Sequence, residues 1–379
     1  MSQIHRRGGP RLAIALFVLA LAFPATSSAK VIVVDGSIQD AVDAASPGDV
    51  ILVPAGLYTG TSGDAVVSVD KDDITIKGST AAVIDATGFD TGILVGPRAR
   101  PSTCPQALVR NFKLQGLTIQ NADDTGVRLV GVAGFSLTHS IYLDNEEYGP
   151  FPVCSSDGVI AHNFAAGHKD AAIYVGDDDG VVVRNNTVTT SAIGIEIENS
   201  LNSTIRANVI TGNTAGILVV VLPGLPIPET TNVTIQANVI ADNNADNPGG
   251  GFVGAIPPGT GILNVGGDAV TIRNNRITGH RTVGVAIIGN GFGEVFGDLR
   301  IDPFVDDNVV ANNNITGNGF DAAPGSIFPG ADIIFFPDVV NPLTGEFLFP
   351  DPDPGNNCFA NNAFDSDFPP GVVSAFPCH

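Results

Sequence analysis

A short motif recurs along this chain and limits the folds that it can adopt. The motif is a Val or Ile, two variable residues, an Asn, one further residue and another Ile or Val. Its central position recurs at intervals of 23, 23, 23 and 22 residues, and then at 30, 37, 38 and 49. A short fixed period that later lengthens predicts a solenoid whose last coils carry inserted loops. The central residues are Leu117, Ser140, Asn163, Asn186, Asn208, Asn238, Asn275, Asn313 and Asn362.

A second apolar segment follows each motif within the same coil, as in Gly194–Ile197 and Gly216–Val219. Short segments with alternating apolar positions are typical of a parallel β-helix, in which each strand pairs with its copy one coil further on. The composition agrees, because 45 Gly and 26 Pro favour strands and turns over helices. We therefore expect one all-β domain over residues 30–379, a single-stranded parallel β-helix (solenoid) of about ten coils.

Local patterns indicate how the coils are held and closed. Stacked Asn side chains can hydrogen-bond to their copies in the next coil, and Asn tolerates the left-handed backbone that we expect at this tight bend. Ser37 precedes an amphipathic pattern over residues 38–45, which predicts a helix that caps the first coil. Pro-rich loops are expected to close the C-terminal end.

Residues 1–29 have the pattern of a signal peptide. A basic start with Arg6 and Arg7 precedes an apolar run over residues 12–23, and small residues lie before Lys30. The run is shorter than the roughly 20 residues of a membrane span. We expect an exported protein, periplasmic or extracellular, with no stable membrane insertion after cleavage. Arg6 and Arg7 also fit twin-arginine export, so the route stays open.

Four cysteines remain after cleavage, and an oxidising compartment favours disulfides. Cys154 directly follows a predicted strand, and Cys104 lies in an insertion over residues 97–110 at the same corner, two coils earlier. The ladder spacing separates those corners by about 10 Å, which a loop of that length can cross. We therefore favour the pairs Cys104–Cys154 and Cys358–Cys378 among the three possible pairings.

Parts of the chain resemble known proteins. Residues 37–58 resemble the N-terminal cap of pectate-lyase-like right-handed β-helix proteins. Residues 148–288 resemble a family of exported bacterial parallel β-helix-repeat proteins, through segments such as Asp170–Gly176 and Gly194–Asn199. The resemblance implies a right-handed helix and export, and the family has no assigned reaction. The wider superfamily implies polysaccharide lyases, hydrolases and epimerases.

Coils of 22 or 23 residues allow outward-facing neighbours to be identified from the sequence. One outward column contains Arg128, Phe151, Tyr174 and Glu196, and Glu198 lies beside it. An aromatic ring beside carboxylates on a flat outer sheet is suited to stack on and hydrogen-bond to a sugar ring. We expect Tyr174, Glu196 and Glu198 to be catalytic, with Arg128 and Phe151 binding substrate.

The corner before these strands is acidic, with Asp124, Glu147 and Asp170 stacked in successive coils. Carboxylates stacked about 5 Å apart repel one another. Three readings stay open. The side chains are splayed in solvent, or they bind Ca²⁺, or one carboxyl keeps its proton and Asp170 takes part in acid–base catalysis.

Residues beside this corner suggest lyase chemistry. β-Elimination of a uronic sugar needs a base and a charge that neutralises the sugar carboxylate. Lys169 and His168 are candidates, together with Tyr174 and Arg128, although a lone His on a turn is more often simply solvated.

The segment Tyr148–Val153 lies where enzymes similar to mannuronan epimerases carry Tyr-Gly-Phe-Asp-Pro-His. Tyr148 is retained as a candidate binding residue, but Phe151 and Val153 stand in place of the Asp and His. This departure weighs against an epimerase mechanism.

Two further features bear on a substrate groove. Arg184, Arg206 and Arg273 form an outward basic column that could bind an anionic sugar or serve only solubility. Long loops inside a compact fold are often functional, and we expect several to flank the face of Glu196. Insertions are expected near residues 97–110, 222–231, 245–259, 290–306 and 319–331.

The first hypothesis is therefore an exported carbohydrate-interacting protein, a polysaccharide lyase or a related epimerase or glycoside hydrolase, with a glycan as its partner. The alternative is a non-enzymatic surface, adhesion or protein-binding module. A net charge of −21 argues against nucleic acid as a partner. No cofactor other than Ca²⁺ is suggested.

Overall fold

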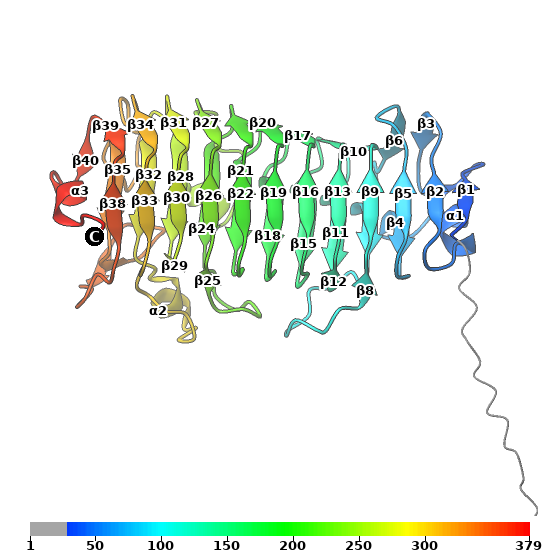
Figure 1. Ribbon diagram of the computed structural model, residues 1–379, viewed down its shortest axis with the longest axis horizontal. Helices are drawn as coiled ribbons and strands as arrows, with labels where there is room; N and C mark the ends of the chain where they lie inside the picture. The colour runs from blue at the N-terminus through cyan, green and yellow to red at the C-terminus, as the bar shows by residue number, and fades with distance from the viewer. Residues whose placement is uncertain (1–28) are drawn as a thin grey trace, which may run out of the picture.

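The computed structural model describes residues 29–379, so residues 1–28 of the expected signal peptide lie outside the described residues. Three parallel sheets run along an elongated molecule, as Figure 1 shows. We call them sheet A, with 12 strands, and sheets B and C, with 11 strands each. Each coil contributes one strand to each sheet, which confirms the expected parallel β-helix.

The strands follow one another around the coil in a fixed order. Sheet A contains β1 (Val31–Val33), β2 (Val50–Leu52), β5 (Thr75–Lys77), β9 (Lys113–Gln115), β13 (Ser136–Thr138), β16 (Val159–Ala161), β19 (Val182–Arg184), β22 (Thr204–Arg206), β26 (Thr234–Gln236), β30 (Thr271–Arg273), β33 (Val309–Ala311) and β38 (Cys358–Ala360). Sheet B contains β3 (Gly56–Tyr58), β6 (Ala82–Asp85), β10 (Thr118–Gln120), β14 (Ile141–Leu143), β17 (Phe164–Ala166), β20 (Thr187–Thr189), β23 (Val209–Thr211), β27 (Val239–Ala241), β31 (Arg276–Thr278), β34 (Asn314–Thr316) and β39 (Ala363–Phe364). Sheet C contains β4 (Ala65–Val69), β7 (Thr91–Val95), β11 (Thr125–Val130), β15 (Tyr148–Val153), β18 (Ala171–Gly176), β21 (Ile193–Glu198), β24 (Ala215–Val220), β28 (Thr260–Val265), β32 (Val283–Ile288), β35 (Ala331–Phe336) and β40 (Asp367–Phe368).

Smaller elements lie in the loops and at the ends. The short strand pairs are β8 (Val109–Arg110) with β12 (Val132–Ala133), β25 (Thr230–Thr231) with β29 (Gly267–Asp268), and β36 (Val339–Val340) with β37 (Phe347–Phe349). The helices are α1 (Ile38–Ala44), the 3-10 turn η1 (Val253–Ala255), α2 (Phe292–Phe296) and α3 (Val372–Ala375).

The Asn column forms a continuous ladder inside the corner between sheets A and B. The Asn208 amide donates to the Asn238 side-chain oxygen at 3.0 Å and to the Val183 carbonyl at 3.0 Å. The Asn208 oxygen in turn accepts from the backbone N–H of Asn186 at 2.9 Å. The same pattern continues through Asn275 and beyond, which confirms the predicted ladder.

One part of that prediction is wrong. The left-handed residue is the one before the ladder Asn, such as Asn185 at φ 54°, Ala207 at φ 55° or Asn274 at φ 55°. The ladder Asn is held by its side-chain hydrogen bonds and does not need the left-handed conformation. The bend falls one residue earlier, which turns the Asn side chain into the coil.

The interior of the helix is apolar along its length. The inward positions Ile173, Ile195 and Ile217 are fully buried, and they stack on one another through the parallel register of sheet C. Because each coil repeats the same inward positions, burial of these side chains and strand pairing favour the same register.

Both ends of the helix are closed, as expected. The Ser37 hydroxyl accepts from the Asp40 N–H at 3.3 Å at the start of α1, whose buried face covers the first coil. At the other end, Phe376 packs on Phe335 with ring centroids 5.0 Å apart. The disulfides Cys358–Cys378 and Cys104–Cys154 both form, as predicted.

Within residues 29–379, no helix is long and apolar enough to cross a membrane.

The ladder yields a stability prediction. Asn208→Ala removes four hydrogen bonds of a buried amide and leaves the Asn186 N–H without its partner. We expect a loss of about 3 kcal/mol in the free energy of unfolding, measured by chemical denaturation. Asn314→Ala, on the exposed face of β34, is the matched control and should cost much less. Equal losses in both variants would contradict a stabilising role for the ladder.

Candidate functional site

The candidate site lies on the outer face of sheet C, where the strands are six residues long. The strand register aligns Tyr174 with Glu196, Glu196 with Leu218, and Glu198 with Val220. The predicted outward columns are therefore confirmed. Acidic and aromatic side chains on β15, β18 and β21 are followed along the same columns by apolar side chains on β24, β28 and β32.

Loops cover this face, whereas the sequence predicted loops that flank it. Glu196 is 3% exposed and Glu198 is 7% exposed, although both point away from the core. Loops that leave the corners on both sides of sheet C fold over its outer face. Several loops project from one edge of the β-helix in Figure 1. They enclose a cavity of about 230 Å³, with Phe252, Phe292 and Phe328 among its covering side chains.

A pair of carboxyl groups forms one wall of this cavity. Asp170, just before β18, and Glu196, on β21, both line the cavity, and the charge of Asp170 contributes to the raised pKa of Glu196. The Tyr148 hydroxyl donates to Asp170 Oδ2 at 2.8 Å. Asp170 Oδ1 is buried and has no hydrogen-bond partner among the described residues. Two neighbouring buried carboxylates cannot both be charged at low cost, so at least one of the two keeps its proton.

The two carboxyl groups differ in their proton affinity. Burial is the main cause that raises both pKa values, to about 7 for Asp170 and well above the usual range for Glu196. The Tyr148 hydroxyl stabilises the Asp170 carboxylate, whereas the charges of Asp170 and Glu198 raise the pKa of Glu196 further. Glu196 is therefore the acid of the pair and Asp170 its carboxylate.

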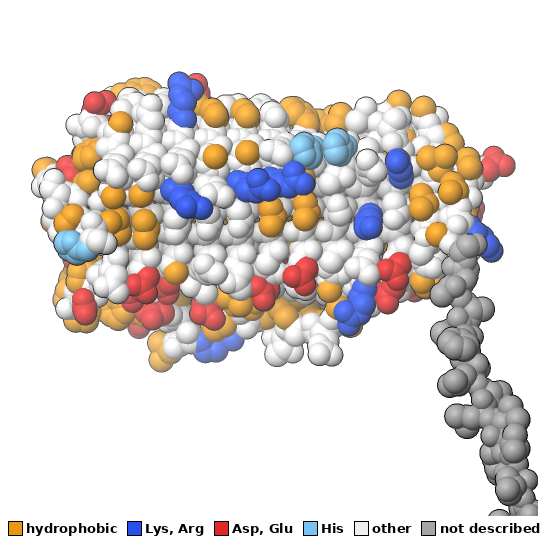
Figure 2. Space-filling view, in the orientation of Figure 1, with side chains coloured by type: hydrophobic (Ala, Val, Ile, Leu, Met, Phe, Trp, Pro, Cys, Tyr) orange, Lys and Arg blue, Asp and Glu red, His pale blue; other side chains and the backbone are white. Residues whose placement is uncertain are grey.

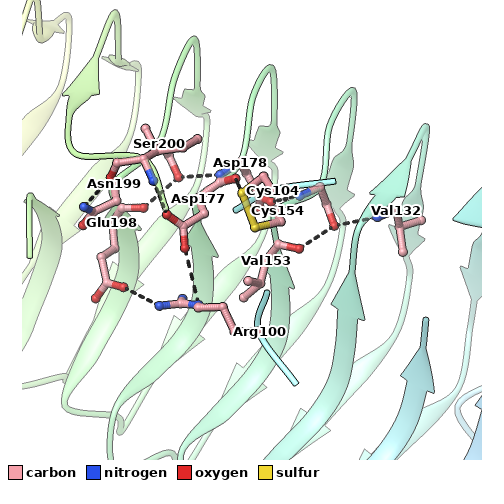
Figure 3. Close-up of a disulfide and its surroundings, with 12 residues drawn as sticks. Arg100, Cys104, Val132, Val153, Cys154, Asp177, Asp178, Glu198, Asn199 and Ser200 are labelled. Carbon is pink, nitrogen blue, oxygen red and sulfur yellow. Dashed lines mark hydrogen bonds and ion pairs between the residues drawn. A yellow bond between two sulfur atoms is a disulfide. The ribbon is translucent and has the colours of Figure 1, made fainter. Parts of the chain in front are cut away.

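Glu198 lies in a separate network that includes a cation. Its carboxylate accepts from the Tyr174 hydroxyl and lies 3.5 Å from the Arg100 guanidinium. Arg100 also contacts the Tyr174 hydroxyl and lies 3.4 Å from Asp177. Burial raises the pKa of Glu198, and Arg100 opposes that rise. Figure 3 shows Arg100 between Glu198 and Asp177, close to the Cys104–Cys154 disulfide.

Aromatic rings pack against the Tyr174 ring of this network. Tyr174 stacks on Phe151 with ring centroids 4.3 Å apart, and the Arg128 guanidinium lies 4.8 Å from the Phe151 ring centroid. Tyr148 packs against both rings. Tyr174 is only 2% exposed, so the prediction that its ring offers a free face to a sugar is wrong. Its neighbour in the preceding coil, Phe151, already occupies that face.

Like Tyr174, the predicted catalytic residues His168 and Lys169 do not line the cavity. His168 is buried in a second internal ladder, where its N–H donates to Ser191 and its ring Nδ1 lies 2.9 Å from the Asn145 carbonyl. Burial lowers its pKa to about 4, so the expectation of a solvated turn residue is wrong. Lys169 points to the surface and pairs with Glu146.

The basic column lies on another face of the molecule. Arg184, Arg206 and Arg273 lie on β19, β22 and β30 of sheet A. Figure 2 shows Lys and Arg side chains in a short row across this face. These arginines therefore do not line the cavity on sheet C, and their proposed contact with a sugar would need a separate binding surface.

The acidic corner does not converge on one point. Asp124 pairs with Arg128 at 3.1 Å, while Asp170 turns to Tyr148. Burial and the Asp124 charge raise the pKa of Glu147. Among the described residues, no group of three or more His, Cys, Asp or Glu is arranged to hold a metal ion. Calcium binding by Asp124, Glu147 and Asp170 stays a prediction, and no step proposed below uses it.

Sequence reasoning missed Arg100, which is the cation of the site. It lies in the 97–110 insertion and belongs to no recognisable sequence motif. The predicted disulfide could have indicated the position of Arg100, because linking Cys104 to Cys154 ties this insertion to the end of β15. A residue four positions before Cys104 then lies within reach of the neighbouring coils.

The raised pKa values predict how stability depends on pH. The unfolded chain releases protons near pH 4, whereas folded Asp170 keeps its proton until about pH 7. The folded state thus binds more protons in this range, and the free energy of unfolding should fall as the pH rises from about 4 to 7. Asp170→Asn should reduce this decline, measured by denaturation at each pH, without abolishing it, because burial also raises the pKa of Asp268. The exposed control Asp157→Asn should leave the decline unchanged, and an unchanged decline in Asp170→Asn would refute the assignment.

Arg100 provides a second test. Arg100→Met leaves Glu198 and Asp177 buried without their cation. We expect a loss on the order of 3 kcal/mol in the free energy of unfolding at pH 8. The loss should be smaller at pH 5, where Glu198 can take up a proton. Arg98→Met removes an exposed Arg of the same loop and should have little effect at either pH. Similar losses in both variants would show that Arg100 is not a buried counter-ion.

Comparisons with known proteins agree with this architecture. Residues 65–221 match the family described as right handed beta helix region. No match is found among curated protein sequences. The A-module of mannuronan C-5 epimerase AlgE4 from Azotobacter vinelandii is similar, with a TM-score of 0.55 and 17% identity over 86% of this chain and 88% of that one. A variant of DFA-IIIase from Arthrobacter chlorophenolicus A6, in complex with DFA-III, has a TM-score of 0.55 and 13% identity over 92% of this chain and 97% of that one.

At such identities the likeness to these two solved structures shows the fold alone. The family match, the three parallel sheets and the capping helix agree with one another. The chain therefore has a right-handed parallel β-helix fold, of which residues 65–221 match the family model.

Proposed function

We propose that this protein is an exported, carbohydrate-active enzyme that cleaves or transfers a glycosidic bond by proton transfer with Asp170 and Glu196. The observation that carries the proposal is the buried pair of carboxyl groups at the wall of a cavity, with Asp170 Oδ1 lacking any hydrogen-bond partner. Perturbed carboxyl groups in a cavity are typical of acid–base catalysis. Two structurally similar proteins are named as a mannuronan epimerase and a DFA-IIIase, which supports a carbohydrate substrate at the level of the fold.

The roles follow from the two proton affinities. Glu196 donates its proton to the glycosidic oxygen as the bond from the anomeric carbon breaks. Asp170 accepts the proton of the attacking hydroxyl, which comes from water or a second sugar. The proton then returns from Asp170 to Glu196, directly or through a water molecule, before the next turnover.

Elimination from a uronate is less well supported. The substrate carboxylate would need a neutralising charge, and no Lys or Arg lines the cavity within residues 29–379. Arg100 is already paired with Glu198 and Asp177. A neutral sugar avoids repulsion from the three carboxyl groups, so we favour hydrolysis or transfer.

Export is part of the proposal. The two disulfides are typical of proteins in an oxidising compartment. The signal-peptide pattern over residues 1–29 supports the same location.

Product assays test the reaction. The mature protein is incubated with neutral glycans and with polyuronates, and both reducing ends and unsaturated products are measured. We expect reducing ends from a neutral glycan, and a loss of at least about a hundredfold in kcat for Glu196→Gln and for Asp170→Asn.

Lys169→Gln is the matched control, because Lys169 neighbours Asp170 in sequence but points away from the cavity. Its kcat should stay unchanged. Full activity in Glu196→Gln would remove the assignment, and unsaturated products from polyuronates would replace hydrolysis with elimination. Glycan binding without any product would favour the binding-module alternative.

A further inference from the structure

The cavity on sheet C has two chemically different ends. Carboxyl groups lie over β18 and β21, and the same outward columns continue as Leu218 and Leu263 and as Val220, Val265 and Ile288. From the coil of Asp170 to the coil of Ile288 there are four strand steps, or about 19 Å at the spacing of parallel strands. The floor is thus acidic at one end and apolar over the remaining three coils.

The side chains that cover the apolar end of the cavity are also apolar. Phe252 and Ile256 come from the loop before β28, Phe292 from α2, and Phe328 from the loop before β35. Phe252 and Phe292 pack edge to face, with ring centroids 5.2 Å apart. Within the described residues, no Lys, Arg, Asn, Gln, Ser or Thr lines the cavity. Its polar side chains are Tyr148, Asp170, Glu196 and Glu198.

This lining restricts what can bind along the whole cavity. A run of sugar units over the apolar coils would leave buried hydroxyl groups without hydrogen-bond partners, which is unfavourable. An anionic ligand would meet carboxyl groups with no free cation beside them. An apolar group would instead gain from burial against the Leu, Val, Ile and Phe side chains. Hydrogen bonding to a sugar is available only at the carboxyl end.

We propose that the cavity binds a neutral glycoside that carries an apolar group, with its sugar at Asp170 and Glu196 and the apolar group over β24, β28 and β32. The proposal rests on the proposed function for the position of the sugar. It narrows the substrate class from polysaccharides to glycosides with an aryl or alkyl group. The apolar end then sets specificity, and the carboxyl pair carries out the reaction at the bond between the two parts.

Matched ligands test the proposal through binding, independently of turnover. Methyl and phenyl glycosides of glucose, galactose and mannose, in both anomeric forms, are titrated calorimetrically into the Glu196→Gln protein, with phenol as the ligand that lacks a sugar. We expect at least one phenyl glycoside to bind at least tenfold more tightly than its methyl counterpart and than phenol. No preference for any phenyl glycoside, or equal binding of phenol, would overturn the proposal.

A lining variant locates the apolar contact. Val265→Thr keeps the side-chain shape and places a hydroxyl on the apolar floor, where it should reduce the preference for phenyl several-fold while leaving methyl glycoside binding unchanged. Leu299→Thr, at an exposed position that does not line the cavity, is the control. A preference for phenyl that survives Val265→Thr unchanged would place the apolar group elsewhere and overturn the assignment.

The two proposals fail in different ways. Binding with a phenyl preference, but without turnover of that glycoside by the wild-type protein, would retain the apolar end and reject the catalytic role of Asp170 and Glu196. Turnover of a neutral polysaccharide without a phenyl preference would retain the catalytic role and reject the apolar-group inference.

Discussion

Hydrogen bonds between a buried Asn side chain and its copy in the next coil hold this solenoid in register. In the coil of Asn208, the amide both donates and accepts, so neighbouring coils cannot slide without breaking several buried hydrogen bonds. Strand pairing by itself would tolerate a shift, but the ladder and the inward apolar column allow only one alignment. The order of side chains on the outer face follows from this register.

A fixed register lets insertions grow without disturbing the coils. The spacing between ladder residues widens from 22 to 49 residues along the chain, yet Asn313 still hydrogen-bonds to Asn362. The added residues therefore leave the corners as loops, and those beside sheet C fold over its outer face. An outer sheet face that would otherwise be exposed to solvent becomes the floor of a cavity. Burial then raises the pKa values of the carboxyl groups on that floor.

The site combines two acidic groups that are stabilised in different ways. Burial keeps at least one of Asp170 and Glu196 protonated, whereas Glu198 lies near Arg100 and the Tyr174 hydroxyl. Arg100 comes from a loop that the Cys104–Cys154 disulfide ties to the end of β15. The covalent link therefore has an electrostatic consequence, because it keeps a cation beside two buried carboxylates. Export to an oxidising compartment would thus favour assembly of the site as well as stability.

The sequence alone determined the features that follow from periodicity. The ladder through Asn186 and Asn208, the outward alignment of Tyr174, Glu196 and Leu218, and the Cys104–Cys154 disulfide depend on register, which a repeat reveals directly. Only the tertiary structure decided which of these side chains are covered and what they touch. Corner geometry decides that His168 turns inward and that Phe151 stacks on Tyr174. A loop that follows no repeat places Arg100 beside Glu198. Such loops are positioned by contacts with distant coils, so their place cannot be read from local pattern, and the cavity that they enclose exists only in the folded chain.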